Sequence, residues 1–231
     1  MEIILKSFDL IFSFDDSLYE IIFLSLKVSI LALLISIFLG MPISALLAIK
    51  EFFLKKTLKI FFNSMMALPP VFVGLFLYIL FSKSGPLGFF EILYTPIIMV
   101  IAQVIIILPI IVSITTDKLE NIFNEYKELF HILEANDFDK ILSVLWDARF
   151  SMLTCIVAGL GRALSEVGAI IIVGGNIIHY TRVMTTTIAL ETSRGNLTLA
   201  MSLGIILIFI ALILNSSALI LKFIAVKASY E

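Results

Sequence analysis

Hydrophobic and polar residues follow one another in long blocks along this chain, without the short period of a soluble helix or strand. Five apolar blocks are long enough to cross a membrane, which takes about 20 helical residues. They cover residues 21–49, 58–81, 94–116, 150–173 and 197–221. We therefore expect an all-α membrane protein with about five transmembrane helices.

Prolines interrupt two of these blocks. Pro42 in the first block predicts a tilt or a kink. Pro69 and Pro70 remove two backbone donors in the middle of the second block. Such a helix break is tolerated in a membrane only where neighbouring helices or a water-filled cavity satisfy the freed carbonyls. Pro69 and Pro70 therefore mark either a permeation pathway or a packing kink.

The composition agrees with a membrane protein. Hydrophobic residues make up 61% of the 231 positions and charged residues 15%, with a mean hydropathy of +1.13. Soluble domains have about 45–50% apolar and about 25% charged residues. The net charge of −2 argues against nucleic acid as a partner. Cys155 is the only cysteine, so no intrachain disulfide can form, and we expect it to be a small core residue.

Lysine and arginine placement predicts the orientation, because cytoplasmic loops are enriched in these residues. One side holds Lys50, Lys55, Lys56, Lys59, Lys118, Lys127, Lys140, Arg149, Lys222 and Lys227, and the other holds Lys6, Lys83, Arg182 and Arg194. The N-terminus is thus expected outside, and residues 223–231 form a cytoplasmic tail. Residues 1–20 lack the features of a cleavable signal and are expected to lie outside or along the membrane surface.

Residues 117–149 form a long cytoplasmic connection with charges of both signs. Apolar residues recur there at helical spacing on both sides of Asn136-Asp137, which predicts two short amphipathic helices joined by a turn. Such a helical hairpin could bind another protein. The alternative is a surface helix on the membrane lipid, which the many acidic residues disfavour beside anionic headgroups.

The outer connection, residues 174–196, is mostly polar. Asn176, Thr181, Thr185 and Thr186 supply neutral hydrogen-bonding groups and are candidates for the outer part of a pathway. Residues 184–190 could form a short external helix.

The fourth block contains two charges, which are costly in lipid and therefore usually pair or line a cavity. Arg162 and Glu166 stand four residues apart, on one face of a continuous helix and near its middle. Small residues surround them, including Ser165, and would allow close helix packing. Two roles remain open for Arg162, Ser165 and Glu166: holding the bundle together, or contacting a permeating species.

Several kinds of chemistry have no motif in this sequence. A Walker A phosphate loop and a zinc-protease H-E-x-x-H motif are both missing. The two histidines, His131 and His179, fall on opposite sides of the membrane and cannot share a metal. We therefore predict no catalytic residue, no metal site and no cofactor.

The chain resembles the permease subunits of ABC importers for molybdate, sulfate and tungstate, most closely those for tungstate. The similarity rests on NSMMALPPV (63–71), SGPLG (84–88), YTP (94–96), AQ (102–103), GRALSEVG (161–168), VGGNI (173–177) and TRVMTTTIALE (181–191). It covers nearly all of the chain beyond residue 20. The resemblance implies the transmembrane domain of a type I ABC importer over residues 21–222.

The resemblance also implies a role for the cytoplasmic hairpin. In this family the loop carries a Glu-Ala-Ala motif, with a glycine four residues after the last alanine, and docks into the ATPase subunit as a coupling helix. Glu128 falls at the glutamate, and Glu134 stands in place of the glycine. The implied coupling residues are Glu128, Leu129, Phe130, Leu133, Glu134, Ala135 and Asn136.

By the same resemblance, two copies of the permease pair, two ATPase subunits bind below them, and an external binding protein delivers the anion. The expected function is ATP-driven import of an oxyanion, most of all tungstate, by alternating access. Molybdate or another oxyanion is the alternative substrate. From other classes, an intramembrane enzyme and a stand-alone channel are the alternatives.

Overall fold

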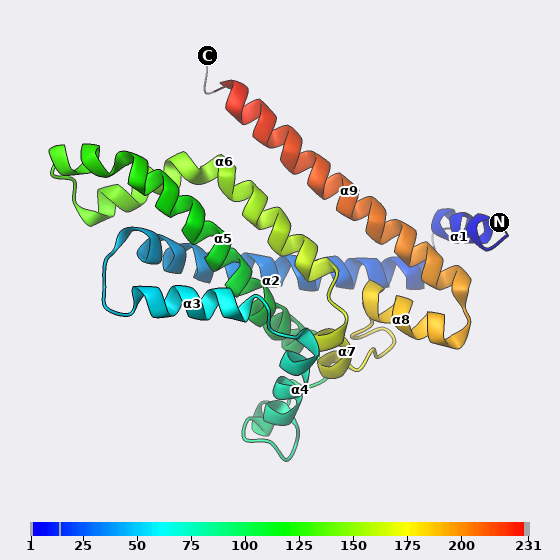
Figure 1. The fold of residues 1–231 in the computed structure, drawn as a ribbon. Helices are drawn as coiled ribbons and strands as arrows, with labels where there is room; N and C mark the ends of the chain where they lie inside the picture. Colours follow the sequence, from blue (N-terminus) through cyan, green and yellow to red (C-terminus); the bar gives the residue numbers. More distant parts are fainter. Residues whose placement is uncertain (1, 14, 229–231) are drawn as a thin grey trace.

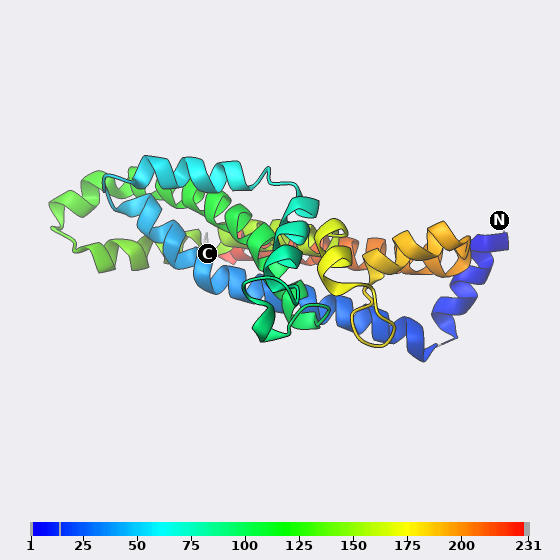
Figure 2. The same cartoon turned by 90° about the horizontal axis from the view of Figure 1, so that it is seen from below.

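A computed structural model describes residues 2–13 and 15–228 of the protein, and over these residues the expected all-helical fold class is confirmed. The bundle is elongated along α2 in both views (Figure 1, Figure 2). In chain order the helices are α1 (Glu2–Phe12), α2 (Asp16–Ile49), α3 (Lys55–Met65), α4 (Pro70–Phe81), the 3₁₀ turn η1 (Gly88–Phe90), α5 (Pro96–Ile132), α6 (Asp137–Leu164), α7 (Gly168–Gly174), α8 (Met184–Arg194) and α9 (Leu197–Ala228).

Four helices, α2, α5, α6 and α9, are long and apolar enough to cross a membrane, and α3 with α4 could form a fifth, bent span. Of these, α5 is the central one. In its apolar stretch 61% of residues are buried, compared with 17% in α9. Met99 and Ala102 of α5 pack with Val28 of α2 and Val173 of α7 in one core cluster. The outer helices therefore present most of their apolar surface to lipid or to another subunit.

The second expected span is two helices. α3 ends at Met65 and α4 begins at Pro70, and the two helix axes differ by 99°. Pro70 occupies the first turn of α4, where its missing N–H costs no hydrogen bond. By contrast, α2 continues as one helix through Pro42.

The connection that the sequence places on the cytoplasmic side also differs from the expectation of two separate short helices. α5 continues to Ile132, and α6 begins at Asp137, so residues 117–149 are the ends of two long helices and the turn between them. No glycine or proline lies between Thr116 and Ile132 to stop α5. The side chain of Asn136 caps α6 by accepting the N–H of Asp139 at 2.9 Å.

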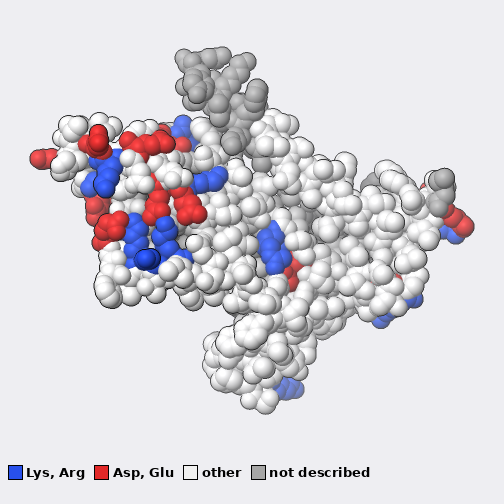
Figure 3. Space-filling view, viewed as in Figure 1, with Lys and Arg blue, Asp and Glu red and all other residues white. Residues whose placement is uncertain are grey.

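Charged side chains gather at the end of the molecule that carries this hairpin (Figure 3). Glu120 of α5 binds Lys59 at 2.5 Å and Lys55 at 3.4 Å, and Lys50 lies 3.4 Å from Asp137. We call this the charged end. These pairs tie the start of α3 and the end of α2 to the hairpin, although the exposed pair of Lys50 and Asp137 contributes at most about 1 kcal/mol.

The N-terminal helix is attached to the far end of the bundle. The Ser7 hydroxyl donates to the Thr198 carbonyl at 3.1 Å, and the Ser202 hydroxyl donates to the Ser7 carbonyl at 3.2 Å. After α1, Asp15 caps α2, and hydrogen bonds from the Ser17 hydroxyl and the Leu18 N–H hold the pKa of Asp15 below its usual value. The predicted surface segment is thus docked on α9 by one face, while its other apolar residues stay exposed.

Candidate functional site

The fourth expected span, residues 150–173, is interrupted where its two charges lie. α6 ends at Leu164, and α7 starts at Gly168. Arg162 is in the last turn of α6, whereas Glu166 lies in the connection, so the two residues do not share a helix as predicted. Their ion pair nevertheless forms across the end of α6, with Arg162 Nη1 3.1 Å from Glu166 Oε2.

Both carboxylate oxygens of Glu166 have partners within the chain. Oε2 binds Arg162, and Oε1 accepts the N–H of Ala169 in the first turn of α7 at 3.0 Å. The Glu166 side chain is 3% exposed, whereas that of Arg162 is 33% exposed. Glu166 therefore joins the end of α6 to the start of α7, and only the arginine is open enough to meet anything outside this joint.

Side chains from two other helices satisfy carbonyls at the interruption. The Gln103 amide of α5 donates to the Ala163 carbonyl at 3.1 Å, and the Thr185 hydroxyl of α8 donates to the Glu166 carbonyl at 2.8 Å. Non-helical backbone inside a membrane protein needs such partners, because lipid offers none. We call Arg162, Glu166, Gln103 and Thr185 the break clamp.

The sequence does not predict Gln103 as a member of this site, because there it stands only within the motif AQ (102–103). Thr185 is predicted only as an outer pathway group. The available signal was that a glutamine stands in the middle of the third apolar block, where an amide is costly unless it is bonded. Gln103 is 1% exposed.

The two interrupted spans contact each other closely through α4 and α7. A methyl group added at Gly74 would lie 2.8 Å from the Cα of Ala169, and one added at Gly168 would lie 2.6 Å from a methyl of Val71. The break at Pro69 and Pro70 is what directs α4 toward α7. Glycine is required at position 74 because the backbone of Ala169 approaches so closely there, whereas the close atom at Gly168 belongs to the Val71 side chain.

Ser165, the third residue of the predicted group, is exposed. Its hydroxyl donates to the Arg162 carbonyl at 3.1 Å. Ser165 therefore caps the end of α6 locally.

The outer pathway candidates hold their own connection together. Thr181 donates to the Gly174 carbonyl at 2.5 Å, and Thr186 donates to the Asn176 side-chain oxygen at 2.9 Å. Thr181 and Thr186 are fully buried, and Thr185 is 9% exposed. In this conformation the hydroxyls of Thr181 and Thr186 fold the segment between α7 and α8, whereas the Thr185 hydroxyl bonds to the Glu166 carbonyl. These hydroxyls are not presented to solvent.

The predicted coupling residues lie around the turn between α5 and α6. Glu128, Leu129 and Leu133 are exposed, while Phe130 is buried against the rings of Phe123 and Tyr126. The half-buried Ala135 and the capping residue Asn136 complete the turn. Glu134 has a φ of +48°, in the left-handed region that favours glycine.

The same turn carries exposed apolar side chains. We define the hairpin tip by six residues that are each at least 48% exposed: Leu129, Ile132, Leu133, Phe138, Leu142 and Trp146. They lie next to the charged end. Large exposed apolar groups rimmed by charge are typical of a protein-binding surface.

Together, the fold and the break clamp define a class of protein. Several apolar helices make the chain a multi-pass membrane protein, and irregular backbone held by polar side chains inside the bundle is typical of transport subunits. The chain is 37% identical over 220 residues to the tungstate uptake system permease protein TupB of Peptoclostridium acidaminophilum, covering 94% of this chain and 96% of that protein.

Two further relatives agree. A probable anion ABC transporter permease protein of Haloferax volcanii is 36% identical over 211 residues, or 89% of this chain and 90% of the relative. The TupB protein of Campylobacter jejuni is 36% identical over 165 residues, or 71% and 69%. No family model matches the chain. The chain belongs to the permease family of anion ABC transporters, whose members are transport subunits.

Proposed function

We propose that this chain is the membrane subunit of an importer for a tetrahedral oxyanion, and that the anion is tungstate. The observation that carries the proposal is the 37% identity to a tungstate permease over nearly the whole of both chains. Relatives named for molybdenum are more distant, at 26% in Bacillus subtilis and 27% in Azotobacter vinelandii. Molybdate is therefore the second candidate.

The energy for transport comes from a separate ATPase that docks on the hairpin tip. Three observations support this assignment: the tip is apolar and exposed, it adjoins the charged end, and the chain lacks a phosphate-binding loop of its own. The positive φ of Glu134 falls where the family loop has glycine. That agreement supports the residue register Glu128 to Asn136 for the coupling segment.

The complete importer contains two permease copies, two ATPase subunits and an external binding protein. Residues 21–222 form the permease domain, the N-terminus lies outside, and residues 223–231 form the cytoplasmic tail in the cytoplasmic membrane of a prokaryote. The charge distribution supports this orientation, because the charged end is lysine-rich. Within the domain the break clamp holds the helices of the bundle in place and does not bind the anion.

Uptake measurements test the substrate. Cells that lack this gene should lose tungstate accumulation and regain it with the intact gene, while molybdate should compete only in large excess. Unchanged tungstate uptake in the deletion strain would refute the importer. Equal competition by molybdate would still support an oxyanion importer, but it would contradict tungstate as the preferred substrate.

Co-purification tests the coupling surface. Leu133→Asp puts a charge on the hairpin tip and should release the ATPase from the purified complex. Phe89→Asp is the matched control, because Phe89 is 73% exposed but lies in η1, away from the charged end. Retention of the ATPase by Leu133→Asp, or its loss from both variants, would contradict the assignment.

Cysteine labelling tests the orientation. In a Cys155→Ser background, Lys83→Cys should react with a membrane-impermeant maleimide added outside, and Lys127→Cys should react only after the membrane is opened. The reverse pattern would invert the topology.

A further inference from the structure

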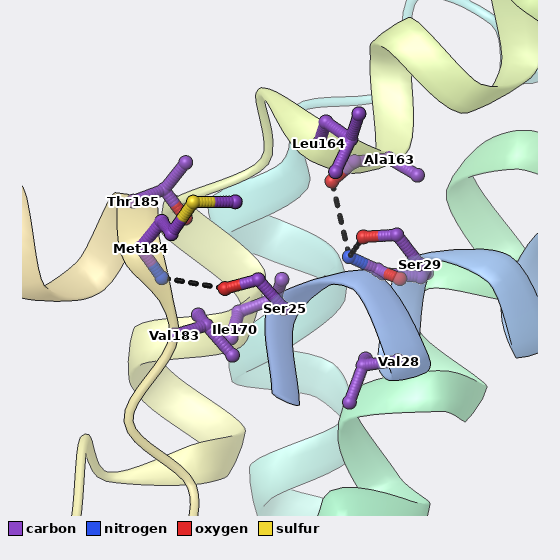
Figure 4. Close-up of a pocket in the computed structure, with 10 residues that line it drawn as sticks. Ser25, Val28, Ser29, Ala163, Leu164, Ile170, Val183, Met184 and Thr185 are labelled. Atoms are coloured by element: carbon purple, nitrogen blue, oxygen red, sulfur yellow. Dashed lines mark hydrogen bonds between the residues drawn. The ribbon is translucent and has the colours of Figure 1, made fainter. Parts of the chain in front are cut away.

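A groove lies at the start of α2, and it is larger than the cavity inside the bundle. The inner cavity, beside the break clamp, holds about 10 Å³ and is bridged by the hydrogen bond from the Met184 N–H to the Ser25 hydroxyl (Figure 4). The groove holds about 70 Å³ and lies at the end of α2 away from the charged end. We call it the α2 groove, and its described lining residues are Ser17, Glu20, Ile21, Leu24, Ile178, His179, Tyr180, Arg182 and Leu199.

Arg182 brings an unpaired positive charge to this groove. Its Nε atom is buried and has no hydrogen-bond partner, and Arg182 forms no ion pair within residues 2–13 and 15–228. Glu20 is the only acidic residue among the described lining residues, and its Oε2 lies 2.6 Å from Nδ1 of His179. A guanidinium group has five donors and keeps its charge. Arg182 is therefore available to an anion from outside the chain.

Lys27 is a second cation on the same side of α2. It follows Glu20 by seven residues, which is two helical turns, and it is the only charged residue between Glu20 and Lys50. Lys27 is exposed, and no ion pair or hydrogen bond holds it among the described residues. The same face of α2 is otherwise apolar, with Phe23 70% and Leu34 56% exposed. An unpaired charge in such a stripe marks a functional site in a membrane protein.

The length of α2 gives the depth of Lys27 in the membrane. Residues 21–49 extend over about 43 Å at about 1.5 Å per residue, whereas the hydrocarbon layer is about 30 Å thick. With this layer centred on the stretch, the backbone of Lys27 lies about 3 Å inside its boundary. The α2 residues of the groove, from Ser17 to Leu24, then lie among the headgroups. Helical side chains lean toward the N-terminal end, so the long lysine stem carries the ammonium group toward the groove.

We propose that the α2 groove binds the phosphate group of a membrane phospholipid, with Arg182 on the headgroup side and Lys27 on the hydrocarbon side. Guanidinium and ammonium groups both bind phosphate, and neither of these two has another partner in the described chain. The exposed apolar stripe of Phe23 and Leu34 offers the acyl chains a surface that a free oxyanion does not use. The site is independent of the anion that the protein transports.

Native mass spectrometry of the purified full-length protein tests the ligand. The probes are dioleoyl phosphatidylglycerol, dioleoylglycerol, which has the same chains without phosphate, and inorganic phosphate, which has no chains. The wild-type protein should retain one phosphatidylglycerol several-fold more tightly than dioleoylglycerol, and equimolar inorganic phosphate should not displace it. Equal retention of dioleoylglycerol, or displacement by equimolar inorganic phosphate, would overturn the proposal.

Charge-removing variants test the two cations. Lys27→Gln and Arg182→Gln should each weaken phosphatidylglycerol retention several-fold. Lys83→Gln is the matched control and should leave retention unchanged, because Lys83 is also exposed but lies between α4 and η1, outside the groove. Lys27 is exposed, so Lys27→Gln keeps the fold and decides alone if Arg182→Gln does not fold.

Unchanged lipid retention in Lys27→Gln would overturn the proposal, as would an equal loss of retention in Lys83→Gln. A loss of permease dimers in Lys27→Gln, with lipid retention unchanged, would identify a second copy of the chain as the occupant of this face and would also overturn it.

Discussion

The two interrupted spans differ in what interrupts them. Between α3 and α4 the chain carries Pro69 and Pro70, which cannot continue a helix, and the axes turn by 99°. Between α6 and α7 there is no proline, and the break is held by the Arg162–Glu166 pair together with Thr185 from α8. One break is encoded locally, and the other depends on distant side chains.

The breaks nevertheless form one structural unit. α4 packs on α7 through Gly74 and Ala169, so the helix released by the prolines supports the helix that starts after Glu166. Substitutions in the break clamp should therefore lower the free energy of unfolding. Replacing Pro69 and Pro70 should change the angle between α3 and α4 more than it changes that free energy.

The largest effect should follow from breaking the ion pair. Arg162→Ala leaves the buried Glu166 carboxylate without its counter-charge, at a cost of about 3 kcal/mol. Arg162→Ala/Glu166→Ala removes both charges and should unfold at a higher temperature than the single variant, although it also loses the bond to Ala169. Thermal unfolding of the purified protein measures both. A double variant less stable than the single one would contradict the clamp.

A smaller effect should come from the contact between the two breaks. Gly74→Ala forces a methyl group against the backbone of Ala169 and should cost about 2 kcal/mol. Gly204→Ala is the control, because an added methyl group there meets nothing within 4 Å. That control should be neutral or stabilising, since alanine favours helix. An equal loss of stability in Gly74→Ala and Gly204→Ala would argue against a tight contact between α4 and α7.

The hydroxyl from α8 should matter less again. Thr185→Val keeps the side-chain shape but leaves the Glu166 carbonyl without its donor, at a cost of about 1–2 kcal/mol. Thr187→Val is the matched control. The Thr187 hydroxyl donates to the Val183 carbonyl, which also accepts the backbone N–H of Thr187. Thermal unfolding should separate the two variants, and equal values would remove Thr185 from the clamp.

The smallest stability change is expected at the proline break. Pro69→Ala/Pro70→Ala should cost less than about 1 kcal/mol, mostly through the unfolded chain. It should broaden the distribution of distances between spin labels at Leu58 and Ile79 toward longer values, because residues 66–69 can then become helical in part of the population while the α4–α7 contact still opposes straightening. An unchanged distribution would mean that packing also sets this bend, and the contrast between the two breaks would disappear.

These differences explain which features could be predicted from the sequence. Hydropathy predicted the apolar spans, and Pro69-Pro70 marked a possible break. Both signals could be read because each depends only on residues that are adjacent in the sequence. The end of α6 at Leu164 could not be predicted, since residues 150–173 are continuously apolar apart from one salt-bridging pair. For the same reason the long helical hairpin was expected as two short helices: a change from apolar to polar sequence does not stop a helix.

The sequence by itself determined the helical class, the approximate spans, the family and the residues of the ion pair. Only the tertiary structure decided that Glu166 lies between two helices and that Gln103 and Thr185 donate to carbonyls at this break. It also decided that Thr181 and Thr186 bond within their own segment. The physical reason is that carbonyls freed inside a membrane need donors, and these donors come from helices that are near in space but far along the chain.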